Sequence, residues 1–152
     1  EFYSNSEYGP NVKAADSAAQ KQWIETSLQK ASPNVRWKLV VGHHPMYTGG
    51  SRTDGYDTKA IRNTLKPLLD QYGVDVYITG HEHSLQHLAT GKLQHIISGA
   101  ASERTAVKLV PESLMAAHEF GFMTMSVNND ALLLQTIDDM GKVIYSTVIK
   151  KQ

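Results

Sequence analysis

The sequence predicts an α/β fold in which a parallel β-α-β unit is followed by an antiparallel meander. Three observations lead to this prediction. Two apolar runs, 36–41 and 74–79, are separated by a long helical pattern. A third apolar run, 92–98, follows them and ends at a glycine. The last third of the chain contains three short runs rich in β-forming residues, joined by polar turns, which is typical of a meander.

The first part of the chain is expected to contribute a helix and a strand. Residues 1–15 are polar and rich in turn formers, so we expect an irregular lead-in. Residues 17–30 carry apolar side chains along one stripe and open with capping-box spacing, which predicts an amphipathic helix. Pro33 ends that helix, because proline cannot continue one. The run 36–41 predicts the first strand.

A long loop and a second helix connect the first two predicted strands. Residues 46–56 contain three glycines and show no periodicity, and long loops in compact domains tend to be functional. A helix is expected from about Asp57 to Gly73, and Pro67 should kink or split it. A helical crossover implies that the strands at either end pair in parallel with a right-handed connection.

The remaining chain is expected to be mostly sheet. Residues 101–119 are ambiguous, and Pro111 with scattered alanine, methionine and leucine suggests a loop with a short helix. The meander strands are predicted at 122–127, 131–137 and 143–149.

Composition limits the possible classes of protein. A chain of 152 residues is one domain by length and can bury a substantial core. Fifteen basic residues balance fifteen acidic ones, so neither nucleic acid nor an anionic membrane is favoured as a partner. No apolar run reaches the length that spans a bilayer. The polar residues 1–5 are not expected to belong to a signal peptide. The absence of cysteine excludes disulfides and thiolate metal sites but leaves the compartment open.

Two predicted strands each lead through a glycine into histidine. Gly42 precedes His43 after the first strand, and Gly80 precedes His81 and His83 after the second. The glycine at 80 should allow a sharp turn, and two histidines one residue apart on an extended segment point to the same side. Neutral imidazole is the commonest protein ligand for transition metals, and α/β folds place their sites at the carboxyl ends of strands. The pattern therefore predicts a metal site.

The other polar residues near this pattern are given supporting or structural roles. A single histidine near a strand end is more often hydrogen-bonded in the core than bound to a metal, so His87 and His95 are expected to have no role at the metal, and His118 a structural one. Glu82 should point away from its neighbouring histidines by alternation, which favours a solvated or supporting position over direct binding.

The motifs VVGHHP at 40–45 and GHEHSLQ at 80–86 resemble the last two of five signature blocks of the calcineurin-like metallophosphoesterases. Within this family the chain is most similar to the purple acid phosphatases, with further similarity at 65–69, 72–74, 97–100 and the Gly121-Phe122 meander. The resemblance implies the carboxyl-terminal half of a four-layer α/β/β/α sandwich in a metal-dependent hydrolase. It also implies a phosphomonoester substrate and two metal ions, iron paired with zinc, manganese or iron.

The resemblance assigns roles to individual residues. His43 and His81 would bind the more labile divalent ion, and His83 would bind its partner iron. Some members carry a histidine in the following loop that protonates the leaving group, but this loop has none. Arg52 is its only strongly cationic residue and suits a phosphate oxygen, although a solvated arginine is the alternative. His44 is a candidate contact to the substrate phosphate, with a packing role as the alternative.

The first three signature blocks of the family, which supply carboxylate, tyrosine and asparagine ligands, have no counterpart in this chain. Three imidazoles divided between two ions cannot complete a dinuclear centre. We therefore expect this chain to be inactive alone and to associate with a separate amino-terminal half or with itself, because an uncovered sheet recruits partners. A non-catalytic module that binds metal or phosphate weakly, and a phosphodiesterase, remain alternatives. The resemblance favours a periplasmic or secreted protein.

Overall fold

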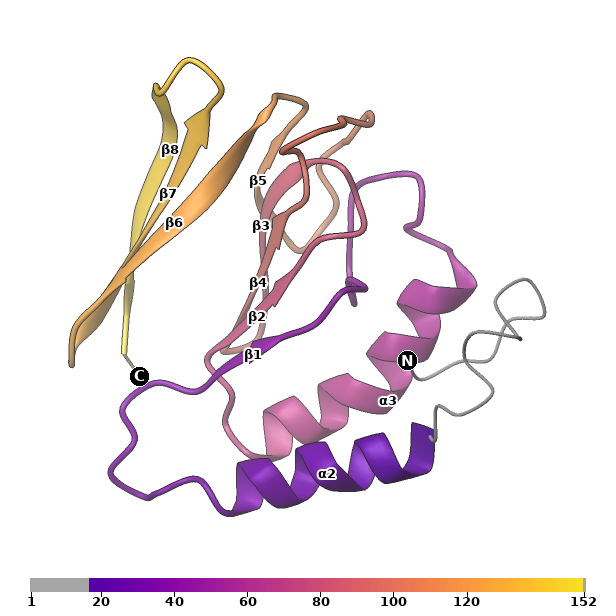
Figure 1. Ribbon diagram of the computed structural model, residues 1–152, viewed down its shortest axis with the longest axis vertical. Coiled ribbons are helices and arrows are strands. Elements are labelled where there is room, and N and C mark those ends of the chain that lie inside the picture. Colours follow the sequence, from indigo (N-terminus) through magenta and orange to yellow (C-terminus); the bar gives the residue numbers. More distant parts are fainter. Residues whose placement is uncertain (1–16, 152) are drawn as a thin grey trace.

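The computed structural model describes residues 17–151, which form three layers (Figure 1). Two helices, α2 (Ser17–Gln29) and α3 (Tyr56–Gln71), cover one face of a five-stranded sheet, and a three-stranded sheet covers the other. The strands are β1 (Leu39–Val41), β2 (Val76–Thr79), β3 (Leu85–Thr90), β4 (Leu93–Ser98), β5 (Ser113–Ala117), β6 (Gly121–Val127), β7 (Ala131–Asp138) and β8 (Val143–Lys150). The lead-in expected over 1–15 lies outside the described residues.

The larger sheet has the strand order β1-β2-β4-β3-β5. Strands β1 and β2 pair in parallel, as do β2 and β4, which confirms the parallel β-α-β unit. Strands β3 and β5 were not predicted, and the short helix expected within 101–119 is wrong, because 113–117 forms β5. The sequence of β3 shows no alternation, since this strand lies between β4 and β5 and its first four residues are all buried.

Helix α3 continues through Pro67, so the proline does not split it. A proline in a helix removes one backbone hydrogen bond. The helix nevertheless buries Leu65, Leu68 and Leu69, and this packing outweighs the local loss. The chain then turns at Gly73, whose φ of 61° is readily adopted only by glycine.

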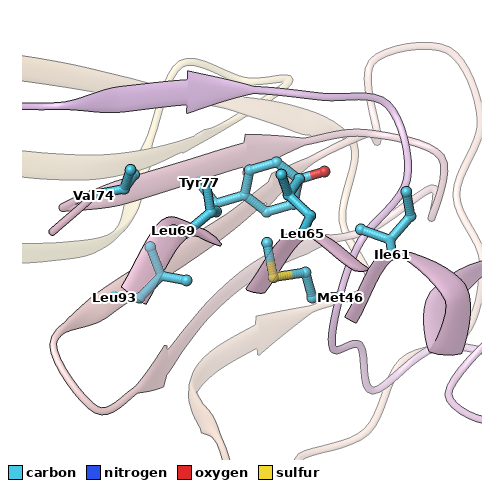
Figure 2. Packing of buried hydrophobic residues seen from close by; sticks show 7 residues of the cluster. All are labelled: Met46, Ile61, Leu65, Leu69, Val74, Tyr77 and Leu93. Carbon is cyan, nitrogen blue, oxygen red and sulfur yellow. The ribbon is translucent and has the colours of Figure 1, made fainter. Parts of the chain in front are cut away.

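Apolar side chains pack on both faces of the larger sheet. The cluster beneath α3 consists of Met46, Ile61, Leu65, Leu69, Val74, Tyr77 and Leu93 (Figure 2). The cluster between the two sheets consists of Val76, Ile96, Leu132 and Leu134. Val76 and Tyr77 belong to different clusters because successive side chains of a strand point to opposite faces. Each fully buried side chain of this size contributes about 1.5–3 kcal/mol, so the central strands are held firmly from both sides.

The three-stranded sheet is the predicted meander. Strands β6, β7 and β8 pair in order and antiparallel, which confirms that prediction. The turn between β7 and β8 is held by the Asp138 carboxylate, which accepts hydrogen bonds from the backbone N–H groups of Met140 and Lys142. Neither helix within residues 17–151 is both long and apolar enough to cross a bilayer.

Strand β1 forms one edge of the larger sheet. Its Val41 side chain is 75% exposed, and Leu39 is also exposed. A cavity of about 480 Å³ lies between α2 and β1, and it is lined largely by apolar side chains, with His43 and His44 also in its lining. Among the described residues, this edge therefore presents apolar side chains without a covering layer.

Candidate metal centre

The backbone joins the two histidine-bearing loops at the carboxyl ends of β1 and β2. Gly42 N–H donates to the carbonyl of Ile78 at 2.9 Å, and Gly80 N–H donates to the carbonyl of His43 at 3.2 Å. These bonds continue the pairing of the parallel strands beyond their ends. As a result, His43 and His81 are held next to one another by the sheet itself.

The backbone after β2 bends sharply at His81. This residue has a φ of 65°, in the left-handed region that non-glycine residues rarely adopt. Backbone bonds from Glu82 N–H to Gly80 and from Ser84 N–H to Glu82, both 2.8 Å, tighten the bend. The expectation of an extended His81–His83 segment is therefore wrong. The turn also does not depend on Gly80, where an added Cβ would meet no atom within 4 Å.

Three histidine rings converge at this corner. Nδ1 of His81 lies 3.0 Å from Nε2 of His43. Two nitrogens that bind one ion at about 2.0–2.1 Å, roughly at a right angle, are separated by about this distance. His44 is the third member, because ligand atoms of all three rings lie within 4.8 Å of one another. Within residues 17–151, this is the one group of three or more such side chains positioned to hold a metal ion.

His83 lies outside this group. Its Nδ1 is 3.0 Å from Oε2 of Glu103, and its carbonyl accepts a hydrogen bond from Thr105 N–H at 2.7 Å. The structure thus brings His43, His81 and His44 together and pairs His83 with a carboxylate. Sequence reasoning missed Glu103, because it lies in the stretch 101–119 that had no clear periodicity.

Asp57 is a second carboxylate that the sequence analysis missed. Its Oδ2 lies 3.0 Å from Nε2 of His81, on the opposite side of the ring from His43. Burial raises the pKa of Asp57, but the hydrogen bonds from Thr58 N–H and His81, together with the charges of His81 and His44, lower it overall. An acidic residue opening the helix after the first histidine loop was the available signal.

The surroundings of His81 lower the pKa of its imidazole. Burial lowers its pKa, and so do the nearby Arg52 and His43, while Asp57 opposes them without reversing the shift. Neutral imidazole offers a lone pair to a metal ion. The environment therefore favours the ligand form of His81 near neutral pH.

The loop that carries Arg52 is fixed by buried polar side chains. Glu82 is only 1% exposed, and its Oε1 accepts a hydrogen bond from Arg52 N–H at 2.7 Å. Gln86 accepts from Gly49 N–H at 2.8 Å. The Arg52 guanidinium is half-exposed and lies 4.0 Å from Oδ2 of Asp57. Glu82 is therefore a supporting residue, and the expectation that it might instead be solvated is wrong.

The remaining histidines have separate surroundings. His87 is buried, with Tyr145 Oη 3.0 Å from Nδ1 and Gln94 Oε1 2.8 Å from Nε2. His95 is fully buried, and burial together with His87 lowers its pKa to about 3. The His118 side chain is exposed.

Histidines that meet at the carboxyl ends of two adjacent parallel strands, β1 and β2, define a candidate metal-binding protein of the α/β class. Residues 4–85 match the family model of the calcineurin-like phosphoesterases. The chain belongs to that family, and its relatives place it in the purple acid phosphatase-like branch.

Curated relatives include purple acid phosphatase 17 of Arabidopsis thaliana, 34% identical over 85% of this chain and 39% of the relative. Human tartrate-resistant acid phosphatase type 5 is 26% identical over 88% of this chain and 43% of the relative. The chain thus spans about two fifths of the length of these relatives.

Solved structures share the fold. GAP50, the anchor in the inner membrane complex of Plasmodium, superimposes with a TM-score of 0.79 and 23% identity over 90% of this chain and 43% of that one. Purple acid phosphatase PPD1 from yellow lupin seeds gives a TM-score of 0.74 and 20% identity, over 86% and 28%. The architecture is that of a metallophosphoesterase, and the described residues supply three of its layers.

Proposed function

We propose that this chain supplies the histidine ligands of a dinuclear metal centre that hydrolyses phosphomonoesters, in the manner of an acid phosphatase. One observation carries the proposal: His43 Nε2 and His81 Nδ1 lie 3.0 Å apart at the carboxyl ends of adjacent parallel strands. Membership of the calcineurin-like family supports a phosphoester substrate and divalent metal ions.

The side chains of the corner have distinct proposed roles. His43 and His81 hold one ion, and His83 leaves Glu103 to hold the second, with iron paired with zinc, manganese or iron as the metals. Bound ions of this kind lower the pKa of a coordinated water and neutralise phosphate charge. His44 donates a hydrogen bond to a phosphate oxygen. Arg52 contributes a planar pair of donors that matches two phosphate oxygens.

The remaining ligands are proposed to come from outside the described residues, from a separate amino-terminal half or from a second copy of this chain. The exposed edge of β1 supports this, because Val41 is 75% exposed and lies directly before the histidine loop. His43 also lines the apolar cavity beside β1. Alone, this chain is expected to be inactive, and the assembled protein is proposed to be periplasmic or secreted.

The activity test is hydrolysis of para-nitrophenyl phosphate with manganese, zinc or iron supplied. No turnover is expected from the chain alone. Turnover that appears after addition of the amino-terminal part of a relative should be lost in His43→Ala and His81→Ala. The exposed His118→Ala is the matched control and should keep full activity. If the assembled protein is active and His43→Ala is equally active, the metal-site assignment is refuted. Faster hydrolysis of bis-para-nitrophenyl phosphate would indicate a phosphodiesterase.

The proposed association is tested by intact mass and light scattering. A particle larger than the 16.8 kDa chain supports association through the β1 edge. Val41→Lys should then shift the protein to the monomer, because a charge on an edge strand opposes further pairing. A monodisperse monomer with no companion chain would contradict the association.

A second candidate is a non-catalytic module that binds metal or phosphate weakly. The position of His83 favours it, because this ring lies outside the group formed by His43, His44 and His81 and pairs with Glu103 instead. A relative that is named for its association with an assembly also supports this candidate. It is glideosome-associated protein 50 of Plasmodium falciparum, 28% identical over 84% of this chain and 33% of the relative. Metal binding without turnover, under every condition of the activity test, would favour this candidate.

A further inference from the structure

We propose that Asp57 is a positioning residue that fixes the tautomer of His81 and so directs the Nδ1 lone pair towards His43. The inference rests on the proposed function, because it concerns an ion at His81. Asp57 Oδ2 lies 3.0 Å from His81 Nε2, and His81 Nδ1 lies 3.0 Å from His43 Nε2. The ring is therefore held at both nitrogens, one by a carboxylate and one by the other candidate ligand.

The chemistry of the carboxylate determines where the proton of His81 resides. An ionised carboxylate can only accept hydrogen bonds, so the His81 nitrogen facing it must carry the proton. Nε2 is then the donor, and Nδ1 keeps its lone pair on the side of His43. Without an ion, His43 Nε2 donates to that lone pair. A carboxylate behind a metal-binding histidine generally fixes the ring and strengthens its basicity.

Asp57 is itself held in place by its element. It lies in the first turn of α3, and its Oδ1 accepts a hydrogen bond from Thr58 N–H at 2.8 Å. Its side chain is only 13% exposed. One helical turn further along, Ile61 is buried in the cluster beneath α3. The position of this carboxylate is therefore set by the packing of the helix.

Asp57→Asn is the informative variant because asparagine has nearly the shape of aspartate but can present a hydrogen-bond donor to His81 in place of an acceptor. Asparagine can keep the bond from Thr58 through its carbonyl oxygen, which places its NH₂ group towards His81 Nε2. A donor at that position favours the tautomer with the proton on Nδ1, which cannot bind an ion there. Asp57→Glu retains a carboxylate and should restore the original tautomer at least in part.

The test uses the metal-free ¹⁵N-labelled protein and zinc titration. In the unmodified chain, NMR should show the His81 proton on Nε2, and in Asp57→Asn it should shift towards Nδ1. Zinc affinity, measured by calorimetry, should fall by about 10–100-fold in Asp57→Asn and less in Asp57→Glu. Asp54→Asn, in the loop just before α3, is the matched control. Asp54 is 91% exposed and pairs only with Lys59, at 3.3 Å, among the ion pairs of residues 17–151. It should leave both readouts unchanged.

The outcomes separate this inference from the proposed function. An unchanged His81 tautomer in folded Asp57→Asn would overturn the positioning role, whatever the activity. If the unmodified chain failed to bind zinc, the metal-site proposal would fail, and the NMR comparison would still decide the role of Asp57. If Asp57→Asn lost its fold by circular dichroism, Asp57→Ala, which removes the acceptor, would decide instead. A His81 proton that stayed wholly on Nε2 in that variant would overturn the positioning role.

Discussion

The buried carboxylate of Glu82 accepts a hydrogen bond from the backbone N–H of Arg52 at 2.7 Å. This contact links the segment between the two histidines of the second loop to the loop that follows the first. Glu82→Ala should lower the free energy of unfolding by about 1–3 kcal/mol, because a part-buried N–H loses its partner. Glu82→Gln keeps an acceptor and should lose less. Urea unfolding measures both, and equal stability of Glu82→Ala and the unmodified protein would contradict the structural role.

Gly50 lies against the same carboxylate. A Cβ added at Gly50 would stand 2.2 Å from Oε2 of Glu82 and 2.5 Å from its carboxyl carbon. Gly50→Ala should therefore displace the Glu82 side chain and lower the melting temperature by several degrees, on the scale of 1–3 kcal/mol for overpacking. Gly80→Ala is the control, since a Cβ there meets no atom within 4 Å. Equal melting temperatures for the two variants would be the contrary result.

Metal binding should stabilise the fold. A ligand that binds only the native state adds about 2.7 kcal/mol at a concentration one hundred times its dissociation constant. Zinc or manganese should therefore raise the melting temperature of the unmodified protein, and a chelator should reverse the rise. In His43→Ala the shift should be greatly reduced. A shift of the same size in that variant would place the ion elsewhere.

His95 predicts a dependence of stability on pH. Its pKa falls from 6.5 to about 3 on burial, so between these values the unfolded chain binds a proton that the folded chain excludes. Stability should therefore decrease as pH falls from about 6.5 towards 3, at about 1.4 kcal/mol per unit of pKa difference. His95→Leu should flatten this dependence, because it removes the buried group that excludes the proton. The Thr79 hydroxyl, which contacts His95, keeps a partner in this variant, since Oγ1 also lies 3.4 Å from the carbonyl of Ile96.

The matched measurement is urea unfolding at pH 4 and pH 7. The exposed His118→Gln should retain the full pH dependence of the unmodified protein. If His95→Leu retained it as well, the proton would be taken up elsewhere, for example at His87, whose pKa burial also lowers.

Sequence reasoning predicted the parallel unit and the meander because both leave clear periodic patterns. It failed at β3, where Leu85, Gln86, His87 and Leu88 are all buried and the alternation of a half-exposed strand is absent. It also failed at β5, because the strand is short and only one of its residues is exposed. In both cases the pairing partners determine the structure more strongly than the local sequence does.

The candidate site was predicted in part. The approach of His43 to His81 follows from the parallel pairing of two strands that end in the same motif. The contacts of Asp57 and Glu103 depend on how a helix start and an irregular segment fold back onto these strands. Neither contact has a fixed spacing in the sequence, so pattern alone could not predict them.

The left-handed backbone at His81 complicates any experiment that removes its ring. His81→Ala removes the imidazole, and alanine also disfavours the left-handed backbone conformation by about 1–2 kcal/mol, whereas asparagine adopts it readily. A loss seen in alanine but not in asparagine would report a disturbed bend, and a loss common to both would report the missing ligand. Studies that need a variant without the His81 ligand but with an undisturbed backbone should therefore use His81→Asn.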